Sequence, residues 1–288
     1  MKLPDGRTIT GYGGILYNIF GLSRLLGDRA EILPICNLGA DVCDPVQRLL
    51  NTLNNVNPIG IHRVDSKNNH CIMTYKASGE RNEIFEGFVP AISIRQLESA
   101  RNCNIAMINF ISGRDLTLRT LKRFRADFNG KIYLDFHTLS LGLHRGGERF
   151  FRKPARWKEY IECCDILQMN RAEFGLLSGC RAPDRQHLTS FFEDRMAGGN
   201  RVMIVTLGER GASMVRKVEM RPKVDFLTGA IPDEIVDTTG AGDVFSAGFC
   251  YGLSLGKSLI DCLKIAVEAS VSACRVKHPE DLRFSIGD

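Results

Sequence analysis

The sequence predicts an α/β protein, built as a three-layer α/β/α sandwich around a mainly parallel sheet, with a small β lid. Two features of the 288 residues support this prediction. Short apolar runs rich in β-branched residues alternate with longer segments of helical periodicity through most of the chain, a pattern typical of strands joined by crossover helices. Between residues 59 and 89 the alternation stops, and the chain reads as three short strands without helices.

The main elements follow in order along the chain. Strands are expected at residues 31–37, 105–111, 131–136, 165–169 and 202–207, and helices at residues 14–26, 44–54, 114–128, 155–163 and 186–196. Because crossovers between parallel strands are right-handed, the helices are expected on both faces of the sheet. Ligands of such sheets bind at the carboxyl ends of the strands.

Residues 59–89 are expected to form a small antiparallel sheet that projects from the main body. Pro and Gly do not cluster into a linker, so we expect residues 1–288 to form one domain with this sheet inserted in it. A lid of this kind would exclude water from a reacting phosphate; the alternative is an edge hairpin with a purely structural role. Exposed lid edges also favour a homodimer paired through the lid.

The composition excludes several classes of protein. Hydrophobic residues make up 44% and charged residues 25% of the chain, as in soluble globular proteins. The net charge of +5 includes no dense Lys/Arg tract, which argues against a nucleic-acid partner. No apolar signal core and no membrane-length apolar run is found, so no membrane partner is expected. The ten cysteines contain no CxxC pair and are expected to be buried free thiols of a cytoplasmic protein.

The most informative segment is IVDTTGAGDVFSAGF at residues 235–249. Two apolar residues end a strand, a tight turn follows, and Asp243 begins a long helix. The glycines of the turn allow several N–H groups to point outward together, and the helix dipole adds to them. Such a turn suits a phosphoryl group, while Asp243 can orient a hydroxyl and take its proton. The alternative makes Asp243 an ordinary acid in the first turn of a helix.

The string DTTGAGDVFSAGF resembles the C-terminal signature of the PfkB/ribokinase family of carbohydrate kinases. This resemblance implies a ribokinase-like fold and a kinase that uses ATP and Mg2+ to phosphorylate a sugar, a sugar acid or a nucleoside. It implies that Asp243 is the catalytic base. It also implies an anion hole formed by the backbone amides of the preceding turn, which consists of Gly240, Ala241 and Gly242.

Two further segments resemble ligand-binding elements of the same family. Gly13, Gly14 and Asn18 resemble the N-terminal Gly-Gly…Asn element, which implies that they approach the sugar and that the Asn amide binds its hydroxyls. Asn170 and Glu173 resemble the N-x-x-E element, which implies that Glu173 organises Mg2+ through water and that Asn170 lies near the phosphates. The alternative is a helix N-cap at Asn170 with Glu173 at the third helical position.

The segment VTLGERG resembles the T-x-G-x-x-G turn that borders the nucleotide site of the family. The resemblance implies that Thr206, Gly208 and Gly211 lie against the nucleotide. Family members often bind a monovalent cation such as K+ beside the C-terminal turn, and Asp237 and Thr239 stand where its ligands would lie.

The chain departs from the family pattern at its start. Family members usually begin with a strand and a substrate-binding Asp before the Gly-Gly element, but here Gly13 and Gly14 come too early for both. A second hypothesis is therefore a non-catalytic ligand-binding or regulatory member that has lost sugar anchoring. The joint presence of Asp243 and Glu173 favours the kinase. A third reading, a phosphatase or hydrolase, has no nucleophile elbow or metal cluster to support it.

Overall fold

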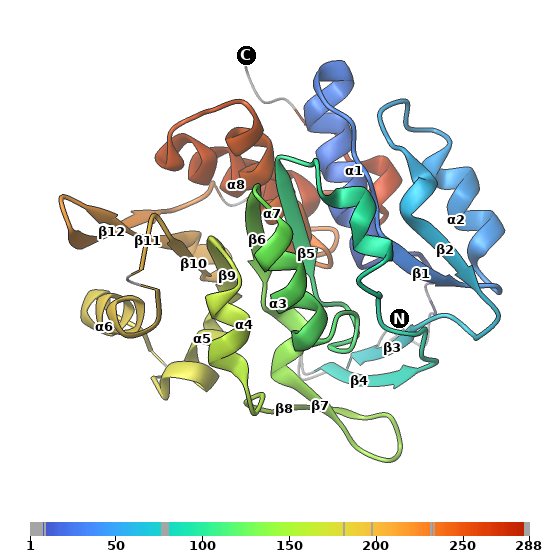
Figure 1. The fold of residues 1–288 in the computed structure, drawn as a ribbon, viewed down its shortest axis with the longest axis horizontal. Helices are drawn as coiled ribbons and strands as arrows, with labels where there is room; N and C mark the ends of the chain where they lie inside the picture. The colour runs from blue at the N-terminus through green and yellow to red at the C-terminus, as the bar shows by residue number, and fades with distance from the viewer. Residues whose placement is uncertain are drawn as a thin grey trace.

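The computed structural model describes residues 8, 10–75 and 81–284, apart from residues 181, 197, 231 and 233, and the side chains of Tyr75 and Arg81 are left out. A six-stranded sheet forms its centre (Figure 1). In spatial order its strands are β12 (Arg221–Leu227), β11 (Ala212–Val218), β10 (Val202–Thr206), β9 (Ile166–Asn170), β6 (Lys131–Asp135) and β5 (Ile105–Asn109). β10, β9, β6 and β5 are parallel, whereas β11 and β12 are antiparallel additions at one edge. The prediction of a mainly parallel sheet is confirmed.

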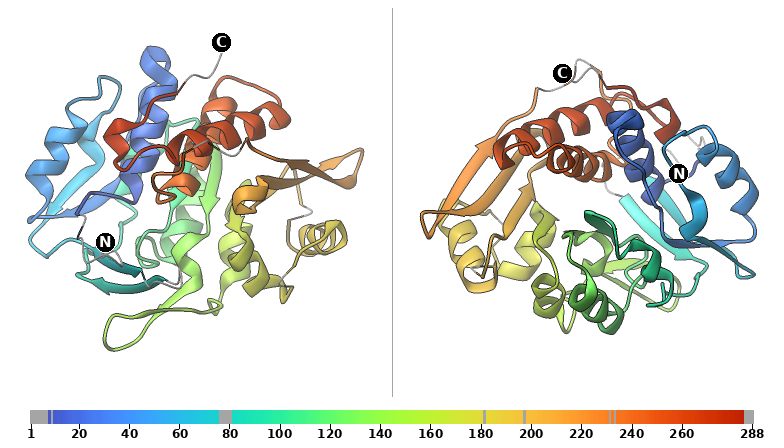
Figure 2. Two further views of the ribbon diagram at one scale, coloured as in Figure 1. Left: turned by 180° about the vertical axis from the view of Figure 1, so that it is seen from behind. Right: turned by 45° about the horizontal axis from the view of Figure 1, so that its top comes forward.

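Helices cover both faces of this sheet (Figure 2). One face carries α1 (Ile15–Leu26), α7 (Ala241–Ser254) and α8 (Leu259–Ala273), and the other carries α3 (Leu118–Asp127), α4 (Trp157–Glu162), α5 (Arg171–Ser178) and α6 (Arg185–Met196). Successive side chains of a strand point to opposite faces of the sheet. In β6, Ile132 and Leu134 belong to the hydrophobic core on one face, and Tyr133 belongs to the core on the other. Each such buried side chain contributes about 1.5–3 kcal/mol. The three-layer sandwich is confirmed.

The N-terminal part forms a smaller unit beside the sheet. β1 (Cys36–Gly39) and β2 (Ile61–Val64) pair in parallel, with α2 (Cys43–Leu50) between them in the chain. The strand expected at 31–37 therefore begins later, because Pro34 lacks the N–H that a strand ladder uses. The other expected elements are present with small shifts at their ends. Short 3-10 turns are η1 (Gly27–Arg29), η2 (Pro58–Gly60), η3 (Gln96–Ala100), η4 (His137–Ser140), η5 (Gly208–Arg210) and η6 (Pro279–Asp281).

The region expected to form the lid contains three strands, as predicted, but they do not form one antiparallel sheet. β3 (His70–Tyr75) and β4 (Arg81–Glu86) pair antiparallel, whereas β2 joins β1 in parallel. The expectation for β2 was wrong because the pattern of a short strand does not reveal its partner. A second hairpin, β7 (Leu141–Leu143) and β8 (Arg149–Phe151), was not predicted, since three-residue strands carry too little periodicity.

The two hairpins are joined through a buried arginine. The Arg149 guanidinium lies 3.2 Å from the Glu83 carboxylate, 2.9 Å from the Ile111 carbonyl oxygen and 4.3 Å from the centre of the Phe85 ring. The backbone N–H of Phe85 also donates to the Gly147 carbonyl at 2.8 Å. β4 is thereby attached to β8 and to the segment that follows β5.

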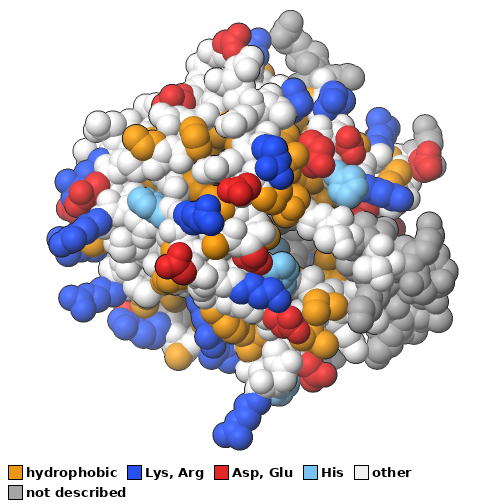
Figure 3. All heavy atoms as spheres, turned by 90° about the vertical axis from the view of Figure 1, so that its right-hand side faces the viewer, with side chains coloured by type: hydrophobic (Ala, Val, Ile, Leu, Met, Phe, Trp, Pro, Cys, Tyr) orange, Lys and Arg blue, Asp and Glu red, His pale blue; other side chains and the backbone are white. Residues whose placement is uncertain are grey.

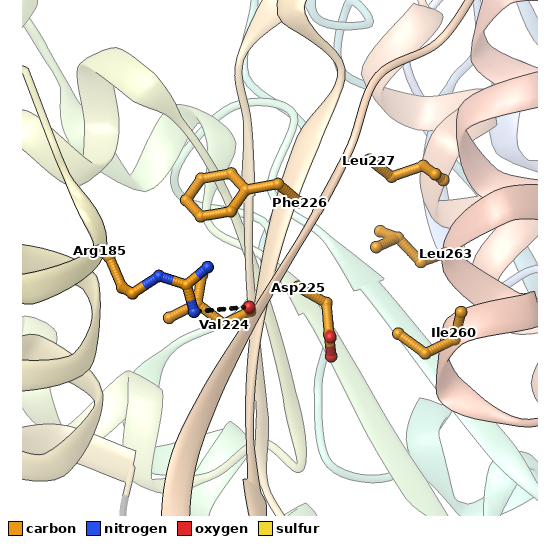
Figure 4. Close-up of a pocket in the computed structure, with 7 residues that line it drawn as sticks. All are labelled: Arg185, Val224, Asp225, Phe226, Leu227, Ile260 and Leu263. Atoms are coloured by element: carbon orange, nitrogen blue, oxygen red, sulfur yellow. Dashed lines mark hydrogen bonds between the residues drawn. The ribbon is translucent and has the colours of Figure 1, made fainter.

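The far edge of the sheet carries a surface groove of about 370 Å³ along β12, between α6 and α8 (Figure 4). Arg185 lies over Phe226 and donates to the Val224 carbonyl at 3.2 Å, which covers part of the free edge of β12. A covered edge resists pairing with another chain. None of the site residues expected from the sequence lines this groove.

Two further expectations concern the surface and the cysteines. Acidic and basic side chains are interspersed on the face shown in Figure 3. The ten cysteines form no disulfide among the described residues, but only half of them are buried, and Cys71 is exposed. Among the described residues no helix is both long and apolar enough to cross a membrane.

Candidate active site

Polar residues end the four parallel strands at one edge of the sheet. Asn109 ends β5, Asp135 ends β6, Asn170 ends β9 and Thr206 ends β10. Asn109 is the register partner of Asp135, and Thr206 is the register partner of Asn170. This edge is therefore a row of hydrogen-bonding groups at the carboxyl ends of the strands, where α/β proteins bind ligands.

The turn 240–242 reaches this row because the ring of Tyr17 supports it. Gly240 caps α7 with φ 81°, and a Cβ atom there would lie 2.4 Å from the Tyr17 ring. Only glycine avoids both the left-handed strain and the clash. The Tyr17 hydroxyl donates to the Lys277 carbonyl at 3.0 Å. α1 and the C-terminal segment thus fix the place of the turn.

The start of α7 presents backbone donors at this place. Gly240 has no side chain to cap the helix, and the first N–H groups of a helix lack partners within it. The Ala241 N–H makes a long contact of 3.3 Å with the Thr238 carbonyl. Together with the positive end of the helix dipole, these donors can bind an anion.

Asp243 lies on the first turn of α7 with only 7% of its surface exposed. Its Oδ1 accepts a hydrogen bond of 2.5 Å from Asn109 Nδ2. Burial raises the pKa of the Asp243 carboxyl to about 7, although the hydrogen bond from Asn109 acts in the opposite direction. A carboxylate with this pKa can accept a proton at neutral pH.

Asn18 is placed differently from the expectation. It is fully buried, and its Nδ2 donates to the Asp243 backbone carbonyl at 2.8 Å and to Ser246 Oγ at 2.9 Å. Its Oδ1 accepts from Asn109 Nδ2 at 2.9 Å. In this arrangement both the NH2 group and the oxygen of Asn18 are bonded within the protein, because α1 packs directly on α7.

A buried glutamine links the sheet to the turn. Gln168 Nε2 donates to Asp135 Oδ2 at 2.8 Å and to the Gly242 carbonyl at 3.1 Å, and its Oε1 accepts from the Tyr133 hydroxyl at 2.5 Å. Burial, followed by the charges of Glu173 and Asp243, raises the pKa of Asp135. Gln168 was not predicted as a site residue, although a polar residue inside the apolar strand ILQMN is a signal of a buried contact.

Asn170 and Glu173 form a capping box at the start of α5. The Asn170 side chain accepts from the Glu173 N–H at 2.9 Å, and Glu173 Oε2 accepts from the Asn170 N–H at 2.9 Å. The capping alternative is therefore confirmed, and it leaves a further role for Glu173 open. Burial raises the pKa of Glu173 to about 8.

Glu173, Asp237 and Thr239, the residues expected to hold cations, offer hard oxygen ligands. Glu173 is buried and interacts electrostatically with the buried Asp135, which was not among them. The described residues contain no group of three or more His, Cys, Asp or Glu side chains around one point, so Mg2+ here would depend on water and phosphate oxygens, as it usually does. The Thr239 N–H donates to Asp237 Oδ1 at 2.8 Å, while Thr239 Oγ1 is buried and has no partner among the described residues. An orphaned oxygen beside a carboxylate fits a monovalent cation.

The remaining expected residues lie in two turns. Gly208 and Gly211 bound the tight turn after Thr206, where the Gly211 N–H donates to the Gly208 carbonyl at 2.9 Å. Gly14 caps α1 with φ 59°, and a Cβ atom there would lie 3.1 Å from Ile111, just past the end of β5. Gly13 is exposed beside it.

Sequence comparison finds related proteins. The model of the family described as pfkB family carbohydrate kinase matches residues 149–281. A ribokinase of Arabidopsis thaliana is 23% identical over 292 residues, which covers 96% of this chain and 70% of that protein. A cytidine kinase of Thermococcus kodakarensis is 24% identical over 268 residues, which covers 92% of this chain and 88% of that protein.

Solved structures share the fold. An Arabidopsis thaliana ribokinase complexed with ribose and ATP superimposes with a TM-score of 0.71 at 21% identity, covering 96% of this chain and 88% of that one. A pyrophosphate-dependent kinase in the ribokinase family, in a sulfate complex, gives 0.77 at 15% identity, covering 98% and 92%.

Together the fold and the relatives define an enzyme of the carbohydrate-kinase class, which transfers a phosphoryl group to an alcohol. These matches confirm the resemblance to the PfkB/ribokinase family of carbohydrate kinases that the C-terminal motif predicted.

Proposed function

We propose that this protein transfers the γ-phosphoryl group of ATP to a hydroxyl of a sugar, a sugar acid or a nucleoside. The observation that carries the proposal is the buried Asp243 carboxylate on the first turn of α7, one residue after the Gly240–Ala241–Gly242 turn. A base and an anion site then lie side by side, as in-line transfer between a hydroxyl and a phosphate requires. The names of the relatives, ribokinase and cytidine kinase, support this substrate class.

Each part of the site has a role in this proposal. Asp243 accepts the proton of the attacking hydroxyl, and the amides of residues 240–242 stabilise the charge on the transferred group. Thr206, Gly208 and Gly211 border the nucleotide, and Asn170 lies near its phosphates. The ribokinase complexed with ribose and ATP supports ATP as the donor.

Cations and the lid complete the proposal. Mg2+, held through water by Glu173, would neutralise phosphate charge. K+ bound at Asp237 and Thr239 would stabilise the adjacent turn at residues 240–242. Gly13 and Gly14 would approach the sugar, because glycine lets a ligand come close to the backbone. The hairpin β3–β4 would act as a lid that excludes water.

The test measures ADP release from ATP with and without Mg2+ across a panel of sugars, sugar acids and nucleosides. Turnover on one class is expected, and Asp243→Asn is expected to lower kcat by roughly 10²–10⁴-fold while ATP still binds. Asp261→Asn is the matched control, because Asp261 occupies the same third position of α8 but its side chain is half-exposed and pairs with Lys264. It should retain full activity.

Three results would count against the proposal. Normal turnover by Asp243→Asn would refute the base assignment. Sugar binding without ADP release for every compound would favour the non-catalytic hypothesis. Turnover with pyrophosphate in place of ATP would change the donor but retain the reaction class, as the pyrophosphate-dependent structural relative suggests.

A further inference from the structure

Two asparagine side chains, Asn18 and Asn109, link the backbone carbonyl of Asp243 to its carboxylate by hydrogen bonds. Its backbone carbonyl accepts from Asn18 Nδ2 at 2.8 Å, Asn18 Oδ1 accepts from Asn109 Nδ2 at 2.9 Å, and Asn109 Nδ2 donates at 2.5 Å to Asp243 Oδ1. These three bonds join α1, β5 and α7 in a closed ring. Ser246 Oγ reinforces it by donating to the same backbone carbonyl at 2.7 Å.

The ring fixes the orientation of both amides. A backbone carbonyl can only accept a hydrogen bond, so Asn18 must direct its NH2 group to Asp243 and its oxygen to Asn109. Asn109 must then direct its own NH2 group to Asn18 and to the Asp243 carboxylate. Reversing the Asn109 amide would place its oxygen against two acceptors, Asn18 Oδ1 and Asp243 Oδ1.

The environment of the Asn109 side-chain oxygen is consistent with this orientation. Its Oδ1 is buried and has no partner among the described residues. A buried carbonyl oxygen without a donor is unfavourable, so the amide gains its stabilisation on the NH2 side, from Asn18 and Asp243. Asn109 is thus a donor held against the base by a second, fully buried side chain.

We propose that Asn109 is a positioning residue that holds the Asp243 carboxylate ionised and leaves its second oxygen for the substrate hydroxyl, with Asn18 acting through Asn109. The proposal rests on the proposed function of Asp243 as the base. Asn109 lies outside every segment that resembles the family. In this proposal Asn18 contributes to the active site by orienting Asn109, whereas it was expected to bind the sugar hydroxyls directly.

The surroundings of Asp243 make this donor important. Tyr17 on α1 and Asp135 on β6 are the titratable groups that interact with it, and burial raises the pKa of both. Gln168 on β9 contacts the neighbouring Gly242 carbonyl and not the carboxylate. Among the described side chains Asn109 alone donates to the carboxylate, and its hydrogen bond opposes the burial that raises the Asp243 pKa.

The experiment measures kcat/KM from pH 5 to 9.5 for the wild type, Asn109→Ala and Asn109→Leu. Losing a hydrogen bond to a charged acceptor should move the midpoint of the acid limb up by about one pH unit. The variants should therefore lose about 10-fold in kcat/KM at pH 6 and recover most of it at pH 9. The matched control is Asn104→Ala, an exposed asparagine just before the start of the same strand, and its profile should coincide with the wild type.

A second variant covers the case in which changes at position 109 prevent folding. Asn18→Ser removes the acceptor that orients Asn109 and should move the acid limb in the same direction by a smaller amount. Acid limbs that coincide with the wild type, with a loss of rate that is uniform across pH, would overturn the proposal. Inactive Asp243→Asn together with unmoved acid limbs would refute this inference alone, whereas active Asp243→Asn would refute the base assignment itself.

Discussion

Replacing Gly240 by alanine tests whether the Tyr17 ring determines the position of the turn. Gly240 has φ 81°, and the added Cβ atom would lie 2.4 Å from two ring atoms of Tyr17. The left-handed backbone costs an alanine about 1–2 kcal/mol, and overpacking of a buried ring adds about 1–3 kcal/mol. We expect Gly240→Ala to lower the free energy of unfolding by about 2–5 kcal/mol in total.

Gly179 offers a matched control for the backbone contribution. It caps α5 with the same φ of 81°, but a Cβ atom there would meet nothing within 4 Å. Gly179→Ala should therefore cost only the backbone strain, about 1–2 kcal/mol. Urea unfolding followed by the fluorescence of Trp157, the one tryptophan of the chain, gives both values.

A double-mutant cycle isolates the clash. In a Tyr17→Ala background the ring is gone, so Gly240→Ala should then cost no more than Gly179→Ala. Equal costs for the two glycine variants in the wild-type background would refute the reasoning, because the Tyr17 contact would then contribute nothing.

Three further predictions follow from the buried polar groups. The folded-state pKa of Asp243 lies above its ordinary value of 3.8, so its ionisation should lower the free energy of unfolding as pH rises from about 4 through 7. The midpoint of urea unfolding should therefore be higher for Asp243→Asn than for the wild type at pH 8, and this difference should be smaller at pH 5. Gln168→Leu should lower the free energy of unfolding by about 1–3 kcal/mol for each buried partner left unsatisfied. It should also lower kcat, since the Gly242 carbonyl loses a donor, and an unchanged kcat would count against the link to the turn. Arg149→Met should remove the ion pair to Glu83 and lower the free energy of unfolding by about 1.5–3 kcal/mol. Proteolysis of the β3–β4 hairpin should then be faster than in the wild type, and equal cleavage rates would show that this ion pair does not hold the hairpin in place.

The order of elements and the position of the candidate site were accessible from the sequence. Periodicity predicted the strands of the parallel sheet, since buried strands are continuous apolar runs and crossover helices alternate with them. The short strands β7 and β8 were not accessible, because three residues carry no measurable period. The partner of β2 was also missed, because the pattern of a strand indicates which side chains face the core but not which strand it pairs with.

The resemblance named Asp243, Glu173 and the glycine turn, because these residues stand in continuous motifs. It could not name Asn109 or Gln168, which lie far from those motifs in the chain. The only local signal for either is a polar residue at the end of, or inside, an apolar strand. Such a signal shows that a contact is needed but does not identify the partner.

The sequence by itself determined the α/β class, the resemblance to carbohydrate kinases and the segment that contains Asp243, because periodicity and motifs are local properties of the chain. Only the tertiary structure decided the environment of Asp243. Asn18 is bonded to Asn109 and to the Asp243 backbone, and Asn109 is the donor to the Asp243 carboxylate, because α1, β5 and α7 pack against one another. Burial and hydrogen-bond partners set the pKa of a carboxyl, and both arise from contacts between segments that are distant in the chain.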